Sequence, residues 1–229
     1  MNSMRRVAKL GLAVLSLLLS ACTPQAPAPV VALERFQKLR FDGQPISLQE
    51  GPWRCVVDRQ TGLVWEVKQA NEGAQFESSS YSWFDGKQGS AKGGSCGKDE
   101  AGMPFMAYHA CDTSDLLTHL NQQKLCGFTD WRLPNSKELR SLLIKHQYPG
   151  ETQVAFPVLP RLVFGPYWSA DWRASNQADA NGIVEVLSLH VGTGQEGWIG
   201  AQRVAYAIAV RSDISSTLPD PQGNFTAKQ

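Results

Sequence analysis

The pattern of apolar and polar residues divides the chain into four parts. An apolar run at residues 10–19 is followed by a polar, proline-rich stretch, a patterned region at 51–213 and a polar tail at 214–229. The tail contains proline and glycine and few apolar residues, so we expect it to be flexible. The patterned region has about 160 residues, a normal size for one domain with its own core.

The patterned region opens with a predicted hairpin. Residues 53–57 and 63–67 have the composition of strands, and residues 58–62 between them are suited to a turn. Within the turn, Asp58 can accept a backbone N–H group two residues on, and Gly62 can adopt a positive φ. A calcium ligand is the rival interpretation of Asp58, and the turn chemistry is favoured over it. Further strands are expected at 166–170, 183–190 and 204–211.

Leucines at three- and four-residue spacing predict a helix at 112–125. Asp112 or Thr113 is suited to cap its first turn, and Gly127 is suited to end it. The preceding stretch, residues 71–110, is rich in glycine, serine and aromatic residues and has little periodicity. We expect it to be a long irregular loop region, which in a compact domain is usually functional or disordered.

A second helix is expected to begin after Pro134 and to end near Gln147. Asn135 and Glu138 have the spacing of a capping box, in which each side chain bonds the backbone N–H of the other residue. Many short strands with two helices in mid-sequence predict an α+β fold, loop-rich and with small antiparallel sheets.

The first 21 residues have the features of a secretory signal peptide. Basic residues precede the apolar run, which is about half as long as the roughly twenty residues that a membrane-spanning helix needs. The run ends in Leu19-Ser20-Ala21-Cys22, which resembles the bacterial lipobox, whose cysteine is lipidated and becomes N-terminal. An ordinary signal peptide followed by an incidental cysteine is the alternative. We expect residues 1–21 to be removed and Cys22 to anchor the protein to a membrane through its lipid.

Residues 22–50 would then carry the lipid and connect it to the domain. Residues 23–29 alternate proline with small residues, which favours an extended and semi-rigid spacer. Thr23 follows the cysteine where an aspartate would retain the protein at the inner membrane, a resemblance to enteric lipoproteins sorted to the outer membrane. The expected location is therefore the bacterial cell envelope, with the lipid in the outer membrane.

Processing changes the charge of the chain. The full sequence has 22 basic and 21 acidic residues, and the signal peptide contains three of the basic residues and no acidic one. The mature protein therefore has 19 basic and 21 acidic residues, a net charge of −2. This balance provides no bulk attraction to nucleic acid, which we do not expect as a partner.

The cysteine count agrees with export to an oxidising compartment. Beyond Cys22 the chain has Cys55, Cys96, Cys111 and Cys126, an even set that predicts two disulfides. Three pairings are possible; we favour Cys55 with Cys126 and Cys96 with Cys111, because the second pair closes one local loop. The spacings of 41, 15 and 15 residues match no common zinc motif, so we expect no metal site and no cofactor.

One segment resembles a known family. Residues 126–139 read C-G-F-T-D-W-R-L-P-N-S-K-E-L, preceded by C-V-V-D at 55–58 and T-G-L-V-W-E at 61–66 and followed by Y-W-S-A at 167–170. Blocks of this kind in this order are similar to the Lcl C-terminal domain family, and the resemblance covers about 160 residues. Within the first block we expect a structural motif in which Arg132 pairs beside Trp131 with the carboxylate of Asp130. The motif comprises Asp130, Trp131, Arg132, Leu133, Pro134 and Glu138.

The resemblance implies a C-type-lectin-like fold with two helices and a small antiparallel sheet. It also implies contact functions, because the named member of the family is a collagen-like bacterial adhesin. That member's C-terminal domain binds sulfated glycosaminoglycans and trimerises. This chain departs from it, since it has no Gly-x-y tract and its mature part is slightly acidic. The oligomeric state and a sulfated ligand are therefore not carried over.

The function expected from these features is non-catalytic binding of a glycan or of an envelope protein. Tryptophan rings can stack on sugars, and Trp83, Trp172 and Trp198 lie in polar or glycine-rich contexts that favour exposure. We expect the other tryptophans to be in the core: Trp53, Trp65, Trp131 and Trp168. We expect a local basic patch or, as the alternative, ordinary solvated surface charges at Arg161, Arg173 and Arg203.

Two other functions compete with binding. A structural envelope component or assembly partner without a small ligand is hard to distinguish from a binding module by sequence. An enzyme is the second, since R-L-P followed by Glu138 also resembles formylglycine-generating oxidases. Those oxidases need a late cysteine pair, and no cysteine follows Cys126. We expect no enzyme and assign no catalytic residues.

Overall fold

The computed structural model describes residues 35–70, 74–96, 110–145, 152–154, 158–175 and 184–212. The predicted signal peptide, Cys22 and the tail from residue 213 lie outside these ranges. The described part is an α+β structure with two helices, small antiparallel sheets and many connecting loops, as the sequence predicted. The further resemblance to C-type lectins stays a prediction.

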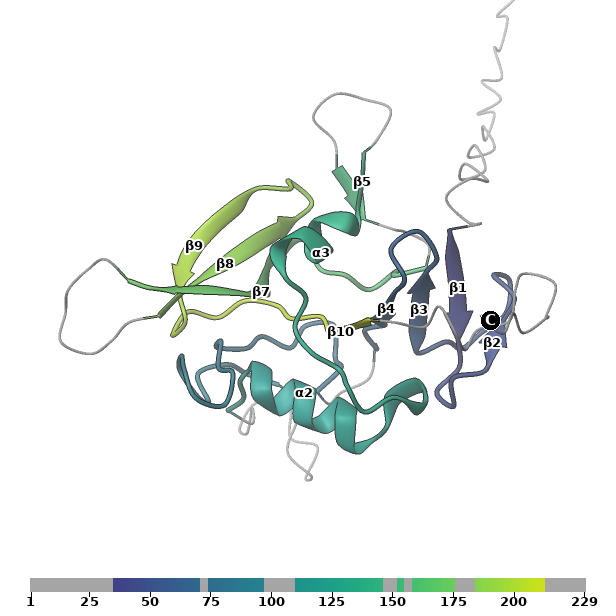
Figure 1. Ribbon diagram of the computed structural model, residues 1–229, viewed down its shortest axis with the longest axis horizontal. Helices are drawn as coiled ribbons and strands as arrows, with labels where there is room; N and C mark the ends of the chain where they lie inside the picture. Colours follow the sequence, from purple (N-terminus) through teal and green to yellow (C-terminus); the bar gives the residue numbers. More distant parts are fainter. Residues whose placement is uncertain are drawn as a thin grey trace, which may run out of the picture.

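The largest sheet has five antiparallel strands in the order β10-β4-β3-β1-β2 (Figure 1). The predicted hairpin is confirmed at its centre. Gly62 has φ +71° and its N–H bonds the Asp58 carbonyl at 2.8 Å, and Asp58 Oδ1 accepts the N–H of Gln60 at 3.0 Å. The strands are β1 (Phe36–Leu39), β2 (Pro45–Ile46), β3 (Cys55–Asp58), β4 (Leu63–Glu66) and β10 (Val210–Ser212).

The sheet includes residues that the sequence assigned to the spacer. β1 pairs with β3 along its whole length, from Phe36 opposite Asp58 to Leu39 opposite Cys55. Arg35, the first described residue, bonds the buried carboxylate of Asp58 through Nε at 2.7 Å and through its terminal nitrogen. An ion pair and a paired strand therefore lie before Gly51, where the sequence placed the start of the domain.

A second sheet has three strands in the order β7-β8-β9. The first two, β7 (Gly165–Ala174) and β8 (Val184–Val191), confirm the strands predicted at 166–170 and 183–190. The third, β9 (Glu196–Gly200), was not predicted, because two glycines and a glutamate weaken its strand signal. Of the strand predicted at 204–211, only the end belongs to β10; the residues before it form isolated bridges to Tyr81 and Tyr167.

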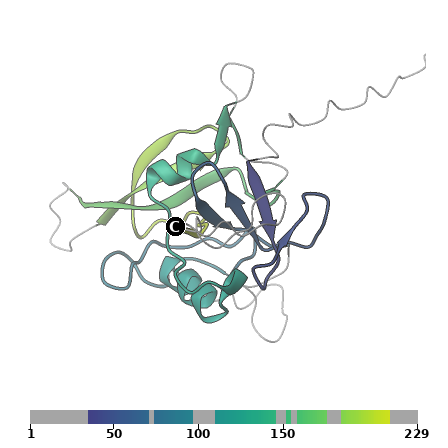
Figure 2. The same ribbon diagram turned by 45° about the vertical axis from the view of Figure 1, so that its right-hand side comes forward.

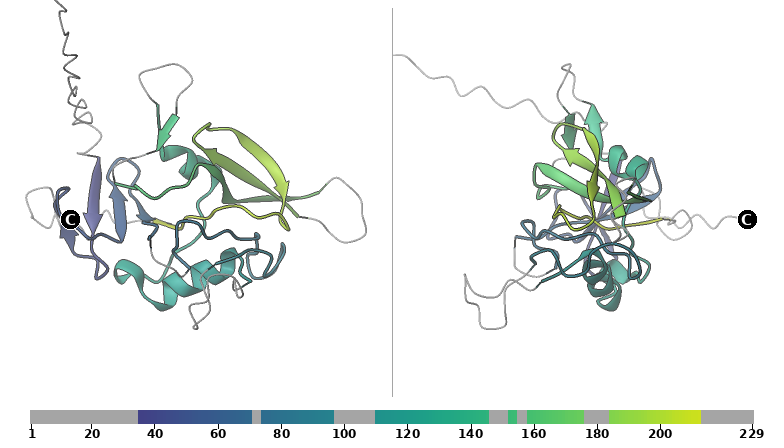
Figure 3. Two further views of the ribbon diagram at one scale, coloured as in Figure 1. Left: turned by 180° about the vertical axis from the view of Figure 1, so that it is seen from behind. Right: turned by 90° about the vertical axis from the view of Figure 1, so that its left-hand side faces the viewer.

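Both helices begin where the capping residues predicted. In α2 (Thr113–Gln122) the Asp112 side chain accepts the N–H of Asp115, and in α3 (Ser136–Ser141) Asn135 and Glu138 form the reciprocal capping box. The helix expected to reach Gln147 ends earlier, because β5 (Leu143–Lys145) follows it and pairs with β6 (Thr152–Val154). Seen from behind and from the side, the two helices lie on opposite sides of the molecule (Figure 3), and α3 lies against β7 and β8 (Figure 2).

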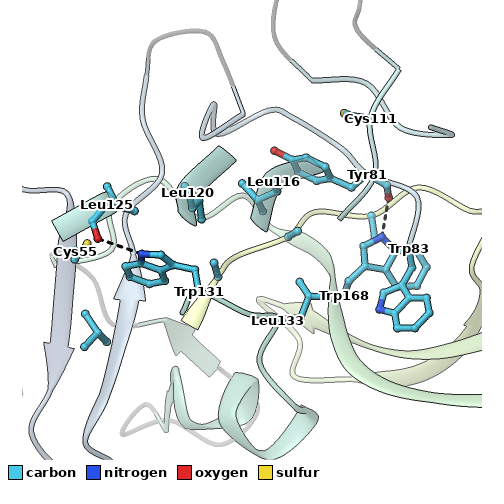
Figure 4. Close-up of a cluster of buried hydrophobic side chains, with 14 of the residues drawn as sticks. Cys55, Tyr81, Trp83, Cys111, Leu116, Leu120, Leu125, Trp131, Leu133 and Trp168 are labelled. Carbon is cyan, nitrogen blue, oxygen red and sulfur yellow. Dashed lines mark hydrogen bonds between the residues drawn. The ribbon is translucent and has the colours of Figure 1, made fainter. Parts of the chain in front are cut away.

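The core consists of two clusters of buried side chains. One joins α2 to the tryptophans Trp83, Trp131 and Trp168, and the other lies around Trp65 between the five-stranded sheet, α3 and β8. In Figure 4 the indole N–H groups of Trp131 and Trp168 donate to the carbonyls of Leu125 and Tyr81, at 3.1 and 2.7 Å. These bonds satisfy the only polar atom of each ring, so each ring can be buried.

The favoured disulfide pairing is confirmed. Cys55 is bonded to Cys126, with their Cα atoms 6.5 Å apart, and Cys96 to Cys111 at 6.0 Å. The first bond ties β3 to the 3-10 turn η1 (Leu125–Gly127) that follows α2, and it is fully buried in the core. The second ties the loop at 74–96 to the residue that precedes the α2 N-cap.

Candidate functional site

The family-like motif at 126–139 has a structural role. Arg132 does not pair with Asp130, so that prediction is wrong; its guanidinium makes a bidentate contact with Glu138, at 2.8 and 2.7 Å. Asp130 pairs instead with Arg211, at 2.7 Å. Arg132 bonds Glu138 and not Asp130 because the Glu138 carboxylate is already held at the start of α3, where it also accepts the Asn135 N–H at 2.8 Å.

The two carboxyl groups of this motif are held ionised. Hydrogen bonding from Arg211 lowers the pKa of Asp130 below its ordinary value. Burial alone would raise the pKa of Glu138, but the bonds from Arg132 and Asn135 outweigh it, so this pKa is also lowered. Trp131, Leu133 and Pro134 are buried. The motif therefore fastens α3 and the last strand to the core, and its charged groups are paired within the protein.

The buried charged pair of Glu66 and Lys68 also has internal partners. Glu66 and Lys68 are both buried and bond at 2.9 Å, while the second oxygen of Glu66 accepts the Ala209 N–H. Burial, together with the nearby charge of Glu66, raises the pKa of Tyr81 above its ordinary value. Within the described ranges no group of three histidine, cysteine, aspartate or glutamate side chains comes together as metal ligands do.

The tryptophans expected in the core are mostly buried. Trp65, Trp131 and Trp168 are fully buried, while Trp53 is half-buried and donates its N–H to the Val158 carbonyl at 2.8 Å. Trp83 was expected to be exposed, and that prediction is wrong: only 1% of it is exposed. Its indole N–H bonds the Ser169 carbonyl at 2.9 Å, so it is part of the core and not of a ligand surface.

The exposed tryptophans lie on opposite faces of the three-stranded sheet. Residues paired across antiparallel strands project from one face, and neighbours along a strand alternate. Trp172, 45% exposed, is opposite Val186, whereas Trp198, 38% exposed, is opposite Leu187. The Trp172 ring accordingly lies 6.4 Å from that of buried Trp83. The two tryptophans therefore do not form one continuous platform.

Charged side chains surround Trp198. The Arg173 guanidinium lies 4.3 Å from the centre of the indole ring and bonds Glu185 Oε2 at 2.8 Å. Glu196, two residues before Trp198 on the same side of β9, pairs with Arg140 of α3 at 2.5 Å. We define the Trp198 face as Arg140, Arg173, Glu185, Leu187, Glu196 and Trp198.

The three arginines proposed for a basic patch are not brought together as one. Arg161 lies before β7 and pairs with Glu77 at 2.9 Å, while Arg173 lies near the end of that strand with Glu185. Arg203 is exposed in the turn after β9, where its N–H bonds the Gly200 carbonyl. Two of the three cations are therefore already matched by a carboxylate.

Sequence reasoning found only part of this face. Trp198 and Arg173 were singled out, but Glu185, Leu187 and Glu196 were not. The two-residue alternation of side chains along the strand predicted at 183–190 would place Glu185 and Leu187 on one side. Nothing in the sequence places Arg140, which belongs to a different element, within reach of Glu196.

The described residues contain no helix that is both long and apolar enough to span a membrane. A family model described as the Lcl C-terminal domain matches residues 54–211, more than half of the chain. Comparison with curated proteins gave no match, and comparison with solved structures gave none.

Proposed function

The chain belongs to the Lcl C-terminal domain family, and on that basis we propose that it is a non-catalytic binding protein, lipid-anchored in the bacterial cell envelope, that holds a glycan on its Trp198 face. The observation that carries the proposal is an exposed indole set among fixed polar groups. A sugar ring presents apolar C–H groups that stack on an aromatic ring, while its hydroxyls bond polar side chains at the rim.

The geometry of the face supports stacking. Arg173 lies over part of the indole and is itself held by Glu185, so the ring is kept in a defined orientation before any ligand arrives. Trp198 is still 38% exposed, and a sugar ring would stack on this exposed part, beside the guanidinium. The strands that carry these residues are paired with one another, which makes the platform rigid. A site of this kind loses little conformational entropy on binding.

The anchor is proposed from the sequence alone. Cys22 follows a lipobox-like Leu-Ser-Ala, and several acyl chains at about 0.8 kcal/mol per buried CH₂ would hold the chain firmly on a bilayer. Metabolic labelling with palmitate tests it directly. Label on the mature protein, lost in Cys22→Ser, is expected, and an unlabelled mature protein would refute the anchor.

A glycan array probed with the mature lipoprotein in detergent micelles tests the binding proposal. We expect Trp198→Ala to lower affinity about tenfold or more, since losing a stacking aromatic costs roughly 1.4 kcal/mol or more. Trp172→Ala is the matched control, because it removes the other exposed tryptophan from the opposite face. Equal effects of the two substitutions, or no binding by the unchanged protein, would contradict the proposal.

One observation favours a second function, that of an assembly partner. β9 is an edge strand, and none of the described strands pairs with its outer side. Such an edge can accept an extended segment of another protein by strand addition. Affinity purification from solubilised membranes separates the two functions: a stoichiometric protein that sugars do not release favours assembly, and release by a sugar favours glycan binding.

A further inference from the structure

The charges of the Trp198 face are balanced in pairs. Arg173 bonds Glu185 at 2.8 Å, and Arg140 bonds Glu196 at 2.5 Å. Two cations and two carboxylates therefore flank the indole. A ligand on this face meets as many fixed negative as positive charges among the residues that define it.

This balance is unfavourable for a polyanion. To reach either guanidinium, a sulfate or carboxylate group would have to approach a glutamate that already bonds it, or replace that glutamate and leave it unpaired. Like charges at such distances repel, and a displaced glutamate would also lose its ion pair. Glu185 and Glu196 thus select against negatively charged ligands.

The same pairs are well suited to hydroxyl groups. Both contacts of Arg173 with Glu185 use Oε2, which leaves Glu185 Oε1 to accept from a hydroxyl. The guanidinium has five N–H donors and uses two of them in these contacts, so it can donate to a neighbouring hydroxyl without breaking the ion pair. Adjacent hydroxyls of one sugar ring can bond the two residues together while the ring stacks on Trp198.

We infer that the ligand of the Trp198 face is an uncharged saccharide, with its ring on Trp198 and adjacent hydroxyls bonded by Arg173 and Glu185. The inference rests on the proposed function and narrows it to one chemical class. It also differs from what the family resemblance implies, since the adhesin of that family binds sulfated chains. Specificity here comes from carboxylates that repel anions as much as from the aromatic ring that attracts sugars.

The test compares two probe sets on the mature lipoprotein in detergent micelles: uncharged oligosaccharides, and sulfated ones of similar length. We expect an uncharged probe to bind with a Kd that changes less than about twofold between about 50 mM and about 500 mM NaCl. A polyanion held by two arginines would instead weaken roughly 60-fold over that range. Trp198→Ala should weaken the uncharged probe at least about tenfold, and Trp172→Ala should leave it unchanged.

Glu185→Gln provides the decisive variant. It keeps an acceptor for a hydroxyl but removes the negative charge beside Arg173, so binding of the sulfated probe should increase several-fold and become salt-sensitive. Binding of the sulfated set through Trp198, stronger than the uncharged set and steeply salt-dependent in the unchanged protein, would overturn the inference while the proposed function stands. Binding of neither set would overturn both.

Discussion

The two disulfides are predicted to contribute unequally to stability. Cys55–Cys126 closes a loop of 71 residues, and Cys96–Cys111 closes one of 15 residues that lies inside it. In the chain-entropy model, a crosslink stabilises the fold by restricting the unfolded chain, and more so for a longer loop. The 15-residue loop gives about 3.0 kcal/mol. The 71-residue loop would give about 4.4 kcal/mol alone, and about 4.2 kcal/mol when the inner crosslink shortens it to roughly 57 residues.

The perturbation is removal of one bond at a time, as the double variants Cys55→Ala/Cys126→Ala and Cys96→Ala/Cys111→Ala. The variant without the outer bond keeps a crosslink worth about 3.0 kcal/mol, and the variant without the inner bond keeps one worth about 4.4 kcal/mol. The outer pair should therefore cost about 1.4 kcal/mol more than the inner pair, and its buried position adds a packing loss in the same direction. Each variant keeps the other disulfide, so each serves as the control for the other.

Urea unfolding at 25 °C, followed by tryptophan fluorescence, measures both free energies. The m-value should also rise more for the outer pair, because the unfolded chain then exposes more surface. An inner pair that costs as much as the outer pair, at unchanged m-values, would refute the reasoning. Loss of the inner bond would then be acting on the native fold and not on the unfolded chain.

Three further predictions concern the motif and the core. Glu138→Ala should lower the free energy of unfolding by about 2–3 kcal/mol, because it removes the capping bond to Asn135 and the partner of Arg132. Glu138→Gln keeps the cap and should lower it by about 1 kcal/mol in the same urea assay. Because the pKa of Glu138 is lowered in the folded protein, its carboxylate stabilises the fold above its ordinary pKa of about 4.3. That contribution should be lost as pH falls through the lowered pKa. In Glu138→Gln the free energy of unfolding should therefore decline less steeply on acidification than in the unchanged protein. Leu120→Ala should cost about 2–5 kcal/mol in thermal or urea unfolding, since Leu120 is fully buried in the core beside the tryptophans; a cost below about 1 kcal/mol would contradict its placement.

The elements predicted best are those specified by local chemistry. Asp58 and Gly62 define the hairpin turn, and Asn135 with Glu138 defines a helix start, all within a few residues of the bonds they form. The elements missed depend on distant partners. β1 is a strand because β3 lies beside it, and α3 ends early because β5 pairs with β6.

In the candidate site, too, local sequence predicts some features and distant contacts decide the others. Trp83 lies in a glycine-rich context that indicates exposure, but its position is decided by Ser169, 86 residues away. Trp172 and Trp198 were correctly expected to be exposed. Their placement on opposite faces follows from the strand register, which local composition does not specify.

The attachment of β1 has a mechanical consequence for a protein held by its N-terminus, as proposed here. Tension on the chain reaches Arg35, which is fastened to Asp58, and then a strand that is hydrogen-bonded along both edges, to β2 and β3. The last residue of that strand is opposite Cys55, whose disulfide leads into the core. A pulling force is therefore shared by the backbone hydrogen bonds of β1 and by the disulfide, so the N-terminal end of the domain resists unfolding under tension.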